Sequence, residues 1–286
     1  MNSGENKRKT EQRNLPGAPF VMLASLFFSI GGLCVKLIPW SPLAINGARN
    51  LIGSAVIGIF LLITHYRIKV NLPVMIGAFS MIGVTTLFAV ANKLTTAANA
   101  IVLQYTAPVF VIIFMALFFH VRPKRQDIIT CGIVFFGVCL FFVDGMQAGN
   151  VLGNLVAVLS GICYAGVFMM NTAEEADALS SSFLGQLLAG IIFVPLCFKE
   201  TDFSLPTMTT VFILGAVQVG LAYIFLSIGI RRTNAVTASL ITGLEPIMNP
   251  IWVAIFYGEK VSGLSVIGAV IVVGAIIIYN VGQAKQ

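Results

Sequence analysis

The stretch from residue 98 to residue 119 reads ANAIVLQYTAPVFVIIFMALFF, 22 residues without a single charged side chain. About twenty apolar residues form a helix roughly 30 Å long, which matches the hydrocarbon core of a bilayer. Similar runs fill most of the chain, since 58% of its 286 residues are hydrophobic and only 10% are charged. A water-soluble domain carries about 25% charged residues. The sequence therefore predicts an integral membrane protein.

Ten such runs follow one another with short loops between them, which leaves no room for a soluble domain. They lie near residues 19–38, 43–64, 72–91, 98–119, 128–143, 151–170, 181–198, 208–230, 235–256 and 263–281. With the N-terminus inside, twelve of the 17 Lys and Arg residues fall in cytoplasmic segments and four at outer ends of the runs. Basic residues accumulate on the cytoplasmic side of membrane proteins. We therefore expect an all-α protein of ten transmembrane helices in the cytoplasmic membrane, N-in and C-in, with residues 1–16 as a cytoplasmic tail.

The second half of the chain echoes the first at an offset of 136 to 138 residues. Pro108 is followed ten residues later by Phe118-Phe119, and Pro246 is followed ten residues later by Phe256-Tyr257. A unit of five spans followed by its copy must cross the membrane in the opposite direction. We therefore expect two inverted five-helix repeats, at residues 17–146 and 150–282. Inverted repeats are typical of secondary transporters, although gene duplication without transport is an alternative explanation.

Several motifs carry a resemblance to a known family. A Pro and then an Arg stand early in span two (Pro42, Arg49), and Leu244-Glu245-Pro246 stands in span nine. Gly258-Glu259 closes that span, and the last helix has spaced glycines. Together these features resemble the EamA family of the drug/metabolite transporter superfamily, which includes exporters of aromatic amino acids and other metabolites. The resemblance implies ten helices and export of amino acids or other small metabolites without ATP.

The first half departs from the family pattern. His120-Val121 stands where Gly-Glu is expected, and Ala107 stands opposite Glu245. The polar stripe and the carboxylate of the second half therefore have no matching partners in the first half. We expect the two halves to contribute unequally to solute specificity.

Prolines within helices point to the solute site. Pro108 and Pro246 occupy matching places in span four and span nine, and Pro250 interrupts span nine again. Each proline removes a backbone donor and loosens one helical turn, which frees carbonyl groups for a solute or water. Kinked helices at matching places in two halves mark the midplane site of many transporters. We assign these three prolines as hinges.

Polar side chains that recur at helical spacing mark the faces expected to line a central cavity. The predicted cavity residues, besides the two charged ones below, are Asn46, Asn50, Gln104, Tyr105, Tyr164, Ser239, Thr242, Asn249 and Trp252. Such groups also bond neighbouring helices together without any role in transport, and this alternative stays open for each of them. Spans five and ten carry no polar stripe, so we expect them to pack at the periphery.

Arg49 and Glu245 are the charged residues that fall well inside expected spans. A charge at that depth is costly and normally faces a pathway or a partner. Glu245 has three candidate roles: a carboxylate that couples transport to protons, a site for a substrate ammonium group, or a structural partner of Arg49.

The function predicted from these features is secondary transport by alternating access at a central cavity, with export favoured. The partners are a small-molecule solute, such as an amino acid, and the lipid bilayer. The basic clusters suit lipid headgroups rather than nucleic acid. No cofactor or metal site is expected, because the sequence has no phosphate-binding GxxxxGK[ST] motif, and its five cysteines show no CxxC spacing. The alternatives are an exporter of drugs or other organic cations, an intramembrane enzyme, although no HExxH or GxSxG motif is present, and a channel or scaffold, although no repeated filter is visible.

Overall fold

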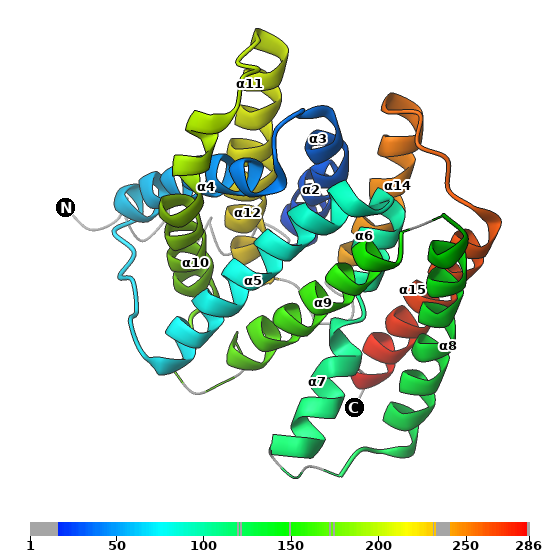
Figure 1. Cartoon of the computed structure of the whole chain (residues 1–286). Helices are drawn as coiled ribbons and strands as arrows, with labels where there is room; N and C mark the ends of the chain where they lie inside the picture. The colour runs from blue at the N-terminus through cyan, green and yellow to red at the C-terminus, as the bar shows by residue number, and fades with distance from the viewer. Residues whose placement is uncertain are drawn as a thin grey trace.

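The computed structural model describes residues 17–118, 120, 122–148, 150–171, 173, 175–230, 232 and 241–284, and the secondary structure in this part of the chain is helical (Figure 1). Within it, eight helical stretches are long and apolar enough to cross a membrane, with mean hydropathies of 1.5 to 2.2. They are Ala18–Leu37, Pro42–Ile63, Leu72–Leu94, Ala97–Phe118, Arg125–Val143, Val151–Met170, Ala178–Lys199 and Leu205–Gly229. Each corresponds to one of the first eight expected spans. A shorter apolar stretch, Gly263–Tyr279, corresponds to the tenth.

Most of these stretches consist of one or two helical segments. The segments of the first half are α2 (Ala18–Ser29), α3 (Gly31–Leu37), α4 (Pro42–Ile63), α5 (Leu72–Leu94), α6 (Ala97–Gln104), α7 (Ala107–Phe118) and α8 (Arg125–Ala148). Those of the second half are α9 (Val151–Asn171), α10 (Ala178–Phe193), η1 (Val194–Lys199), α11 (Leu205–Ile213), η2 (Leu214–Leu221), α12 (Ala222–Ile230), α14 (Glu245–Phe256) and α15 (Gly263–Ala284). The expected ninth span is described only in part, because residues 233–240 lie outside the described ranges.

The ends of several helices are fixed by local sequence. The hydroxyl of Ser41 accepts a hydrogen bond from the backbone N–H of Ala44 at the start of α4, and Pro42 stands at the first helical position. Asn71 caps α5 in the same way by accepting from the N–H of Val74 at 3.0 Å. These N-caps satisfy donors that a helix leaves unpaired, and Pro suits the first turn because its missing N–H is not needed there.

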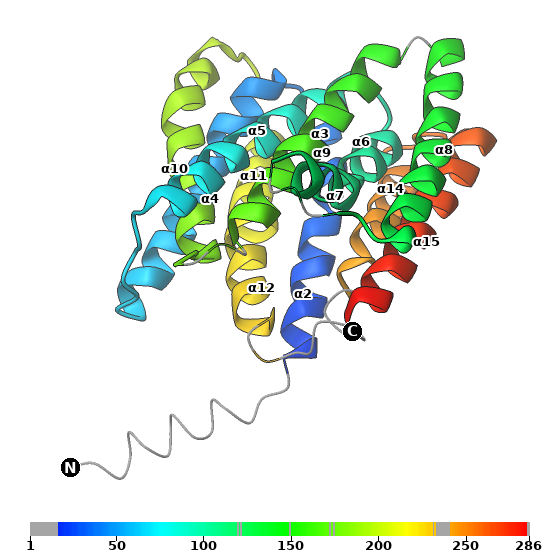
Figure 2. The same ribbon diagram turned by 90° about the horizontal axis from the view of Figure 1, so that it is seen from below.

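When each helix is replaced by the helix at the matching position in the other half, pairs of helices in contact correspond to other pairs in contact. α5 packs against α9, and the matching pair α12 and α2 is also in contact. α10 packs against α5, and its counterpart α4 packs against η2. Figures 1 and 2 both place α4, α10 and α12 on one side of the bundle and α7, α8 and α15 on the other. The contacts therefore have the arrangement of two similar halves.

Counterpart helices run antiparallel where they touch. A methyl group built at Gly47 of α4 would meet Phe193 at the end of α10, and one at Gly190 would meet Leu51. Residue numbers thus rise along α4 while they fall along α10. α8 and α15 show the same relation, since Gly282 lies against Gln126 and Gly268 against Phe141.

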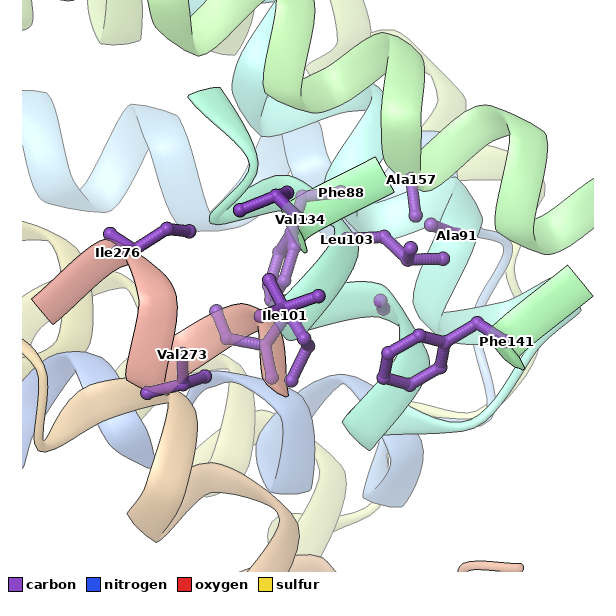
Figure 3. Close-up of a cluster of buried hydrophobic side chains, with 12 residues drawn as sticks. Phe88, Ala91, Ile101, Leu103, Val134, Phe141, Ala157, Val273 and Ile276 are labelled. Atoms are coloured by element: carbon purple, nitrogen blue, oxygen red, sulfur yellow. The ribbon is translucent and has the colours of Figure 1, made fainter. Parts of the chain in front are cut away.

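A buried apolar cluster ties α8 and α15 to the rest of the bundle (Figure 3). Val134 and Phe141 of α8 and Val273 of α15 pack with Ile101 and Leu103 of α6. The outward faces of both helices are apolar as well, with Phe135 69% and Val270 69% exposed. Large exposed apolar surfaces mark contact with membrane or protein. α8 and α15 lie at one edge of the bundle (Figure 1), as expected for spans five and ten.

Candidate functional site

The break before Pro246 places Glu245 at the first position of α14. Proline has no N–H, so the carbonyl group of Thr242, four residues earlier, loses its helical partner. The hydroxyl of Tyr105 lies 3.4 Å from this carbonyl oxygen and donates a hydrogen bond of 2.6 Å to Oε2 of Glu245. Tyr105 itself stands at the matching break, between α6 and α7. The two broken helices therefore meet through Tyr105, Thr242 and Glu245.

Two further tyrosines lie near this carboxylate. Tyr164 of α9 and Tyr223 of α12 both pack against a small apolar cluster that contains Met81 and Val84 of α5. Both hydroxyl groups are within electrostatic range of Glu245. The hydroxyl of Tyr223 also lies 3.4 Å from Sδ of Met81. Tyr105 thus bonds the carboxylate of Glu245 directly, and Tyr164 and Tyr223 lie near it on α9 and α12.

A second polar group is built around Arg49 of α4, which is only 2% exposed. Its Nη2 donates to the backbone oxygen of Thr85 at 2.6 Å and to Oδ1 of Asn46 at 3.2 Å. Asn50 donates to the same Oδ1 at 2.7 Å, and Asn46 donates to the hydroxyl of Thr86 at 2.9 Å. Asn46, Arg49 and Asn50 therefore form one hydrogen-bonded network against α5.

The charge of Arg49 has no acidic partner among the described residues, where the ion pair found is Lys36 with Glu259. Arg49 and Glu245 therefore do not pair, and the structural role considered for Glu245 is absent here. The reason is that a backbone carbonyl and Asn46 already satisfy Nε and Nη2 of the guanidinium. Its Nη1 makes no hydrogen bond within the described part of the chain. A buried charge without a counter-ion is costly, so Arg49 is available to an anionic group.

Helix α5 connects the two polar groups. The backbone oxygen of Thr85 accepts a hydrogen bond from Arg49, while Sδ of Met81, four residues earlier, contacts the hydroxyl of Tyr223. Four residues rise about 6 Å along a helix. Tyr223 is within electrostatic range of both Arg49 and Glu245. Arg49 and Glu245 thus both lie near Tyr223.

The remaining predicted residues are distributed around this centre. Gln104 donates to the hydroxyl of Ser160 at 2.6 Å, which ties α6 to α9. Trp252 donates to the hydroxyl of Ser29 at 3.0 Å, which ties α14 to α2. Both side chains thus make helix-to-helix bonds in this structure. Ser239 lies outside the described residues.

Asn249 is fully buried, and neither atom of its side-chain amide has a hydrogen-bond partner among the described residues. The amide lies against Gly32, where an added methyl group would come within 2.3 Å of its oxygen. Unpartnered buried amides are rare and costly. This amide therefore suits a polar ligand atom or water between α3 and α14. α14 continues through Pro250 without a break, whereas the helices are interrupted at Pro108 and Pro246.

Some of this site was not predicted from the sequence. The backbone oxygen of Thr85 carries no side-chain signal, so its contact with Arg49 follows only from packing. Gln218 lies in η2, a π-helical segment, and its buried side-chain oxygen has no hydrogen-bond partner in the part of the chain that the structure describes. π-helical turns are frequent at functional sites. The nearby Gly31-Gly32 pair accommodates Gln218 and Asn249, but a glycine pair in apolar sequence is too common to have identified these two residues.

A cluster of ionic and polar contacts joins three segments at the end of the bundle where α3 ends. Nζ of Lys36 lies 2.7 Å from Oε1 of Glu259 and donates to the backbone oxygen of Thr95 at 2.8 Å. Oε2 of Glu259 accepts from the backbone N–H of Ala97 at 2.8 Å. The side chains of both charged residues are mostly buried, 12% and 14% exposed. We call Lys36 and Glu259 the terminal ion pair.

The neighbouring loops at this end are also bonded together. Glu200 accepts from the backbone N–H and the hydroxyl of Ser41, and Trp40 donates to the backbone oxygen of Asp202 at 2.7 Å. Hydrogen bonds from Thr207 and Ser204 lower the pKa of Asp202, so its carboxylate stays ionised at neutral pH. This end of the bundle is therefore held together by contacts between segments distant in the sequence.

Comparison with known proteins gives consistent similarities over nearly the whole chain. The profile of the EamA-like transporter family matches residues 15–143 and again residues 151–281. The chain is 23% identical over 279 residues to the uncharacterized transporter YwfM of Bacillus subtilis, covering 93% of this chain and 94% of that protein. It is 24% identical over 213 residues to the threonine/homoserine exporter RhtA of Salmonella typhimurium, covering 72% of this chain and 70% of that protein. A solved crystal structure superposes with a TM-score of 0.64 at 17% identity, covering 94% of this chain and 98% of the other.

Proposed function

Since the chain belongs to the EamA-like transporter family, we propose that it is a secondary transporter that exports amino acids or similar small metabolites by alternating access. It is a multi-pass cell membrane protein and a transporter of small solutes. One relative is an exporter of threonine and homoserine, which supports amino acids as the class of solute. Members of this group move solutes rather than transform them, so we assign no catalytic step to the chain.

We further propose ten transmembrane helices in two inverted repeats, residues 17–146 and 150–282, with both termini in the cytoplasm. The antiparallel contacts of α4 with α10 and of α8 with α15 support inversion, because counterparts in inverted repeats run in opposite directions. The ninth helix would end with α14. The distribution of Lys and Arg supports the orientation.

The observation that carries this proposal is the position of Glu245 between two broken helices. Its carboxylate is held by Tyr105 at 2.6 Å through Oε2, and Oε1 has no hydrogen-bond partner within the described residues. A carboxylate inside the bilayer normally serves a pathway. Glu245 would bind the ammonium group of a solute or exchange a proton with it, and Arg49 would attract a carboxylate.

The terminal ion pair serves as the outer gate in this account. It joins α3, the start of α6 and the loop before α15, and these contacts support a closed outer end. The first repeat has Val121 at the position matching Glu259, so the corresponding inner gate would lack this carboxylate. Alternating access would require the terminal ion pair to break when the outer end opens.

An exporter of organic cations is the second candidate. The carboxylate of Glu245, its partner Tyr105 and the nearby Tyr164 and Tyr223 would suit a cation, because aromatic faces attract positive charge. Arg49 favours the amino acid, since a cation alone would leave its charge unpaired. Counterflow of a matched amino acid and its decarboxylated amine distinguishes the two candidates.

Replacement of Glu245 tests its role. In proteoliposomes, Glu245→Gln should lower exchange of the accepted solute at least about tenfold, equivalent to about 1.4 kcal/mol, at normal folded yield. Any dependence of wild-type exchange on a pH gradient should disappear as well. The matched control is Glu175→Gln, because Glu175 lies exposed in a loop. Unchanged exchange and pH dependence in the Glu245 variant would remove this residue from the mechanism.

A further inference from the structure

A hollow of about 680 Å³ lies between α8 and α15, away from the Glu245 site. Its volume is in the range of small-molecule pockets, about 300–1,000 Å³. The walls are largely apolar and include Ile129 and Ile133 of α8 and Val270 and Ile278 of α15. These four side chains are 44% to 73% exposed, so the hollow opens to the outside of the bundle.

The hollow is elongated along the two helices. Arg125 and Ile133, which both line it, are eight residues apart on α8, a rise of about 12 Å. On α15, Gly274 lies one turn from both Val270 and Ile278, and a methyl group added there would have nothing within 4 Å. The missing side chain at Gly274 therefore helps to form the floor of the groove.

The charge of the groove is concentrated at one end. Arg125, the first residue of α8, lines the hollow, is exposed and has no acidic partner among the residues described. Arg122 and Lys124 precede it directly in the sequence. The other end, around Ile133 and Val270, is apolar. The groove thus suits an amphiphile with an anionic head and a hydrocarbon chain.

We infer that this groove binds an anionic phospholipid, with the phosphate at Arg125 and one acyl chain between α8 and α15. Basic pockets between transmembrane helices are known to hold anionic headgroups, and basic residues next to a bilayer attract anionic lipids. Arg125 lies at the end of an apolar span of 19 residues, Arg125–Val143, which is the depth of a headgroup. The proposal does not depend on which solute the protein transports.

A second copy of the chain is the competing occupant. Two-fold contacts place the same surface of each subunit against the other. A hollow surface applied to its own copy leaves empty space, and it brings two Arg125 side chains to the same contact region. A flexible acyl chain fills such a groove without these costs. The shape and charge therefore favour the lipid.

Native mass spectrometry of the full-length protein tests the inference. Delipidated protein is titrated with phosphatidylglycerol and with phosphatidylcholine of the same acyl chains. We expect the wild type to retain phosphatidylglycerol about fivefold more strongly, the effect of one basic side chain on anionic lipid. Arg125→Gln should remove this preference, whereas Gly274→Leu should reduce retention of both lipids because its side chain fills the groove.

Matched controls separate the groove from general effects. Arg67→Gln removes another exposed arginine, and Gly263→Leu adds the same side chain at a second open glycine outside the groove. Both controls should retain lipid as the wild type does. Equal retention of the two lipids by the wild type, or equal losses in variants and controls, would overturn the inference. A dimer lost specifically in Gly274→Leu would overturn it too, and would assign the groove to a second copy.

Discussion

Tyr105 connects the two broken helices with a single hydroxyl group. It donates to Glu245 at 2.6 Å and lies 3.4 Å from the backbone oxygen of Thr242. Hydrogen bonds to charged groups contribute about 1.5–3 kcal/mol. The hydroxyl therefore fixes the carboxylate in one orientation, from which Oε1 is left for a solute or a proton.

Removal of this hydroxyl should impair transport without unfolding the protein. Tyr105→Phe keeps the ring and loses both contacts, so we expect exchange to fall about tenfold, in line with one charge-assisted hydrogen bond. The matched control is Tyr257→Phe, since Tyr257 lies 49% exposed at the end of α14. Exchange measured by counterflow in proteoliposomes checks this. Equal rates in both variants and the wild type would show that Tyr105 does not act through Glu245.

At the level of single residues, the sequence predicted which charges are unusual but not how they are satisfied. Arg49 and Glu245 were identified because they fall within apolar runs. Which groups these two side chains contact depends on how α4, α5 and α14 pack, and the spacing of residues in the sequence does not contain that information. In the structure, Thr85 supplies a backbone carbonyl to Arg49 instead.

Among the helices, the breaks at Pro108 and Pro246 were predictable because proline lacks the donor that a helix requires. The break at Ile30 and the π-helical segment η2 were not predicted. Both result from tertiary packing: Gly31 lies against Gln218 of η2, and Gly53 of α4 lies against Val219. Glycines in apolar sequence are too frequent to indicate which of them are close contacts.

The contact between α4 and η2 gives a prediction about stability. Gly53→Ala would place a methyl group 2.3 Å from Cγ1 of Val219, which forces the helices apart. Overpacking of this kind costs about 1–3 kcal/mol, so the thermal midpoint in detergent should fall. Gly132→Ala is the control, because its methyl group would have nothing within 4 Å and alanine favours a helix. Equal midpoints for the two variants would contradict the packing described here.

For the whole molecule, the terminal ion pair predicts a shift between two conformations. In a cysteine-free background, Ser29→Cys places a thiol beside Trp252, where Ser29 is fully buried. Lys36→Met and Glu259→Gln should each increase labelling of this thiol by a membrane-impermeant reagent added from the outside. Breaking a partly buried pair favours the open outer end. Lys260→Met, which removes the exposed neighbouring charge, should leave labelling unchanged.

If the thiol of Ser29→Cys is labelled equally with and without the substitutions at Lys36 and Glu259, the terminal ion pair does not hold the outer end closed. Labelling that rises with Lys260→Met as well would assign the effect to surface charge instead of the gate.

The arrangement of the whole bundle was largely predictable from the pattern of apolar runs. Eight of the expected spans appear as apolar helices of sufficient length, and α15 corresponds to the tenth. The contact between Lys36 and Glu259 was not predicted, because the two residues are distant in the sequence and each stands at the end of an expected span. Their pairing arises only once α3, α6 and the loop before α15 converge.

Counterflow in proteoliposomes tests secondary transport most directly. Vesicles that contain the purified protein are loaded with an unlabelled amino acid, and uptake of the same labelled amino acid is followed against a panel of other solutes. The account predicts transient, saturable accumulation that depends on the internal amino acid and requires no ATP. Solute flux that does not saturate and ignores the internal solute, or no flux for any member of the panel, would contradict it.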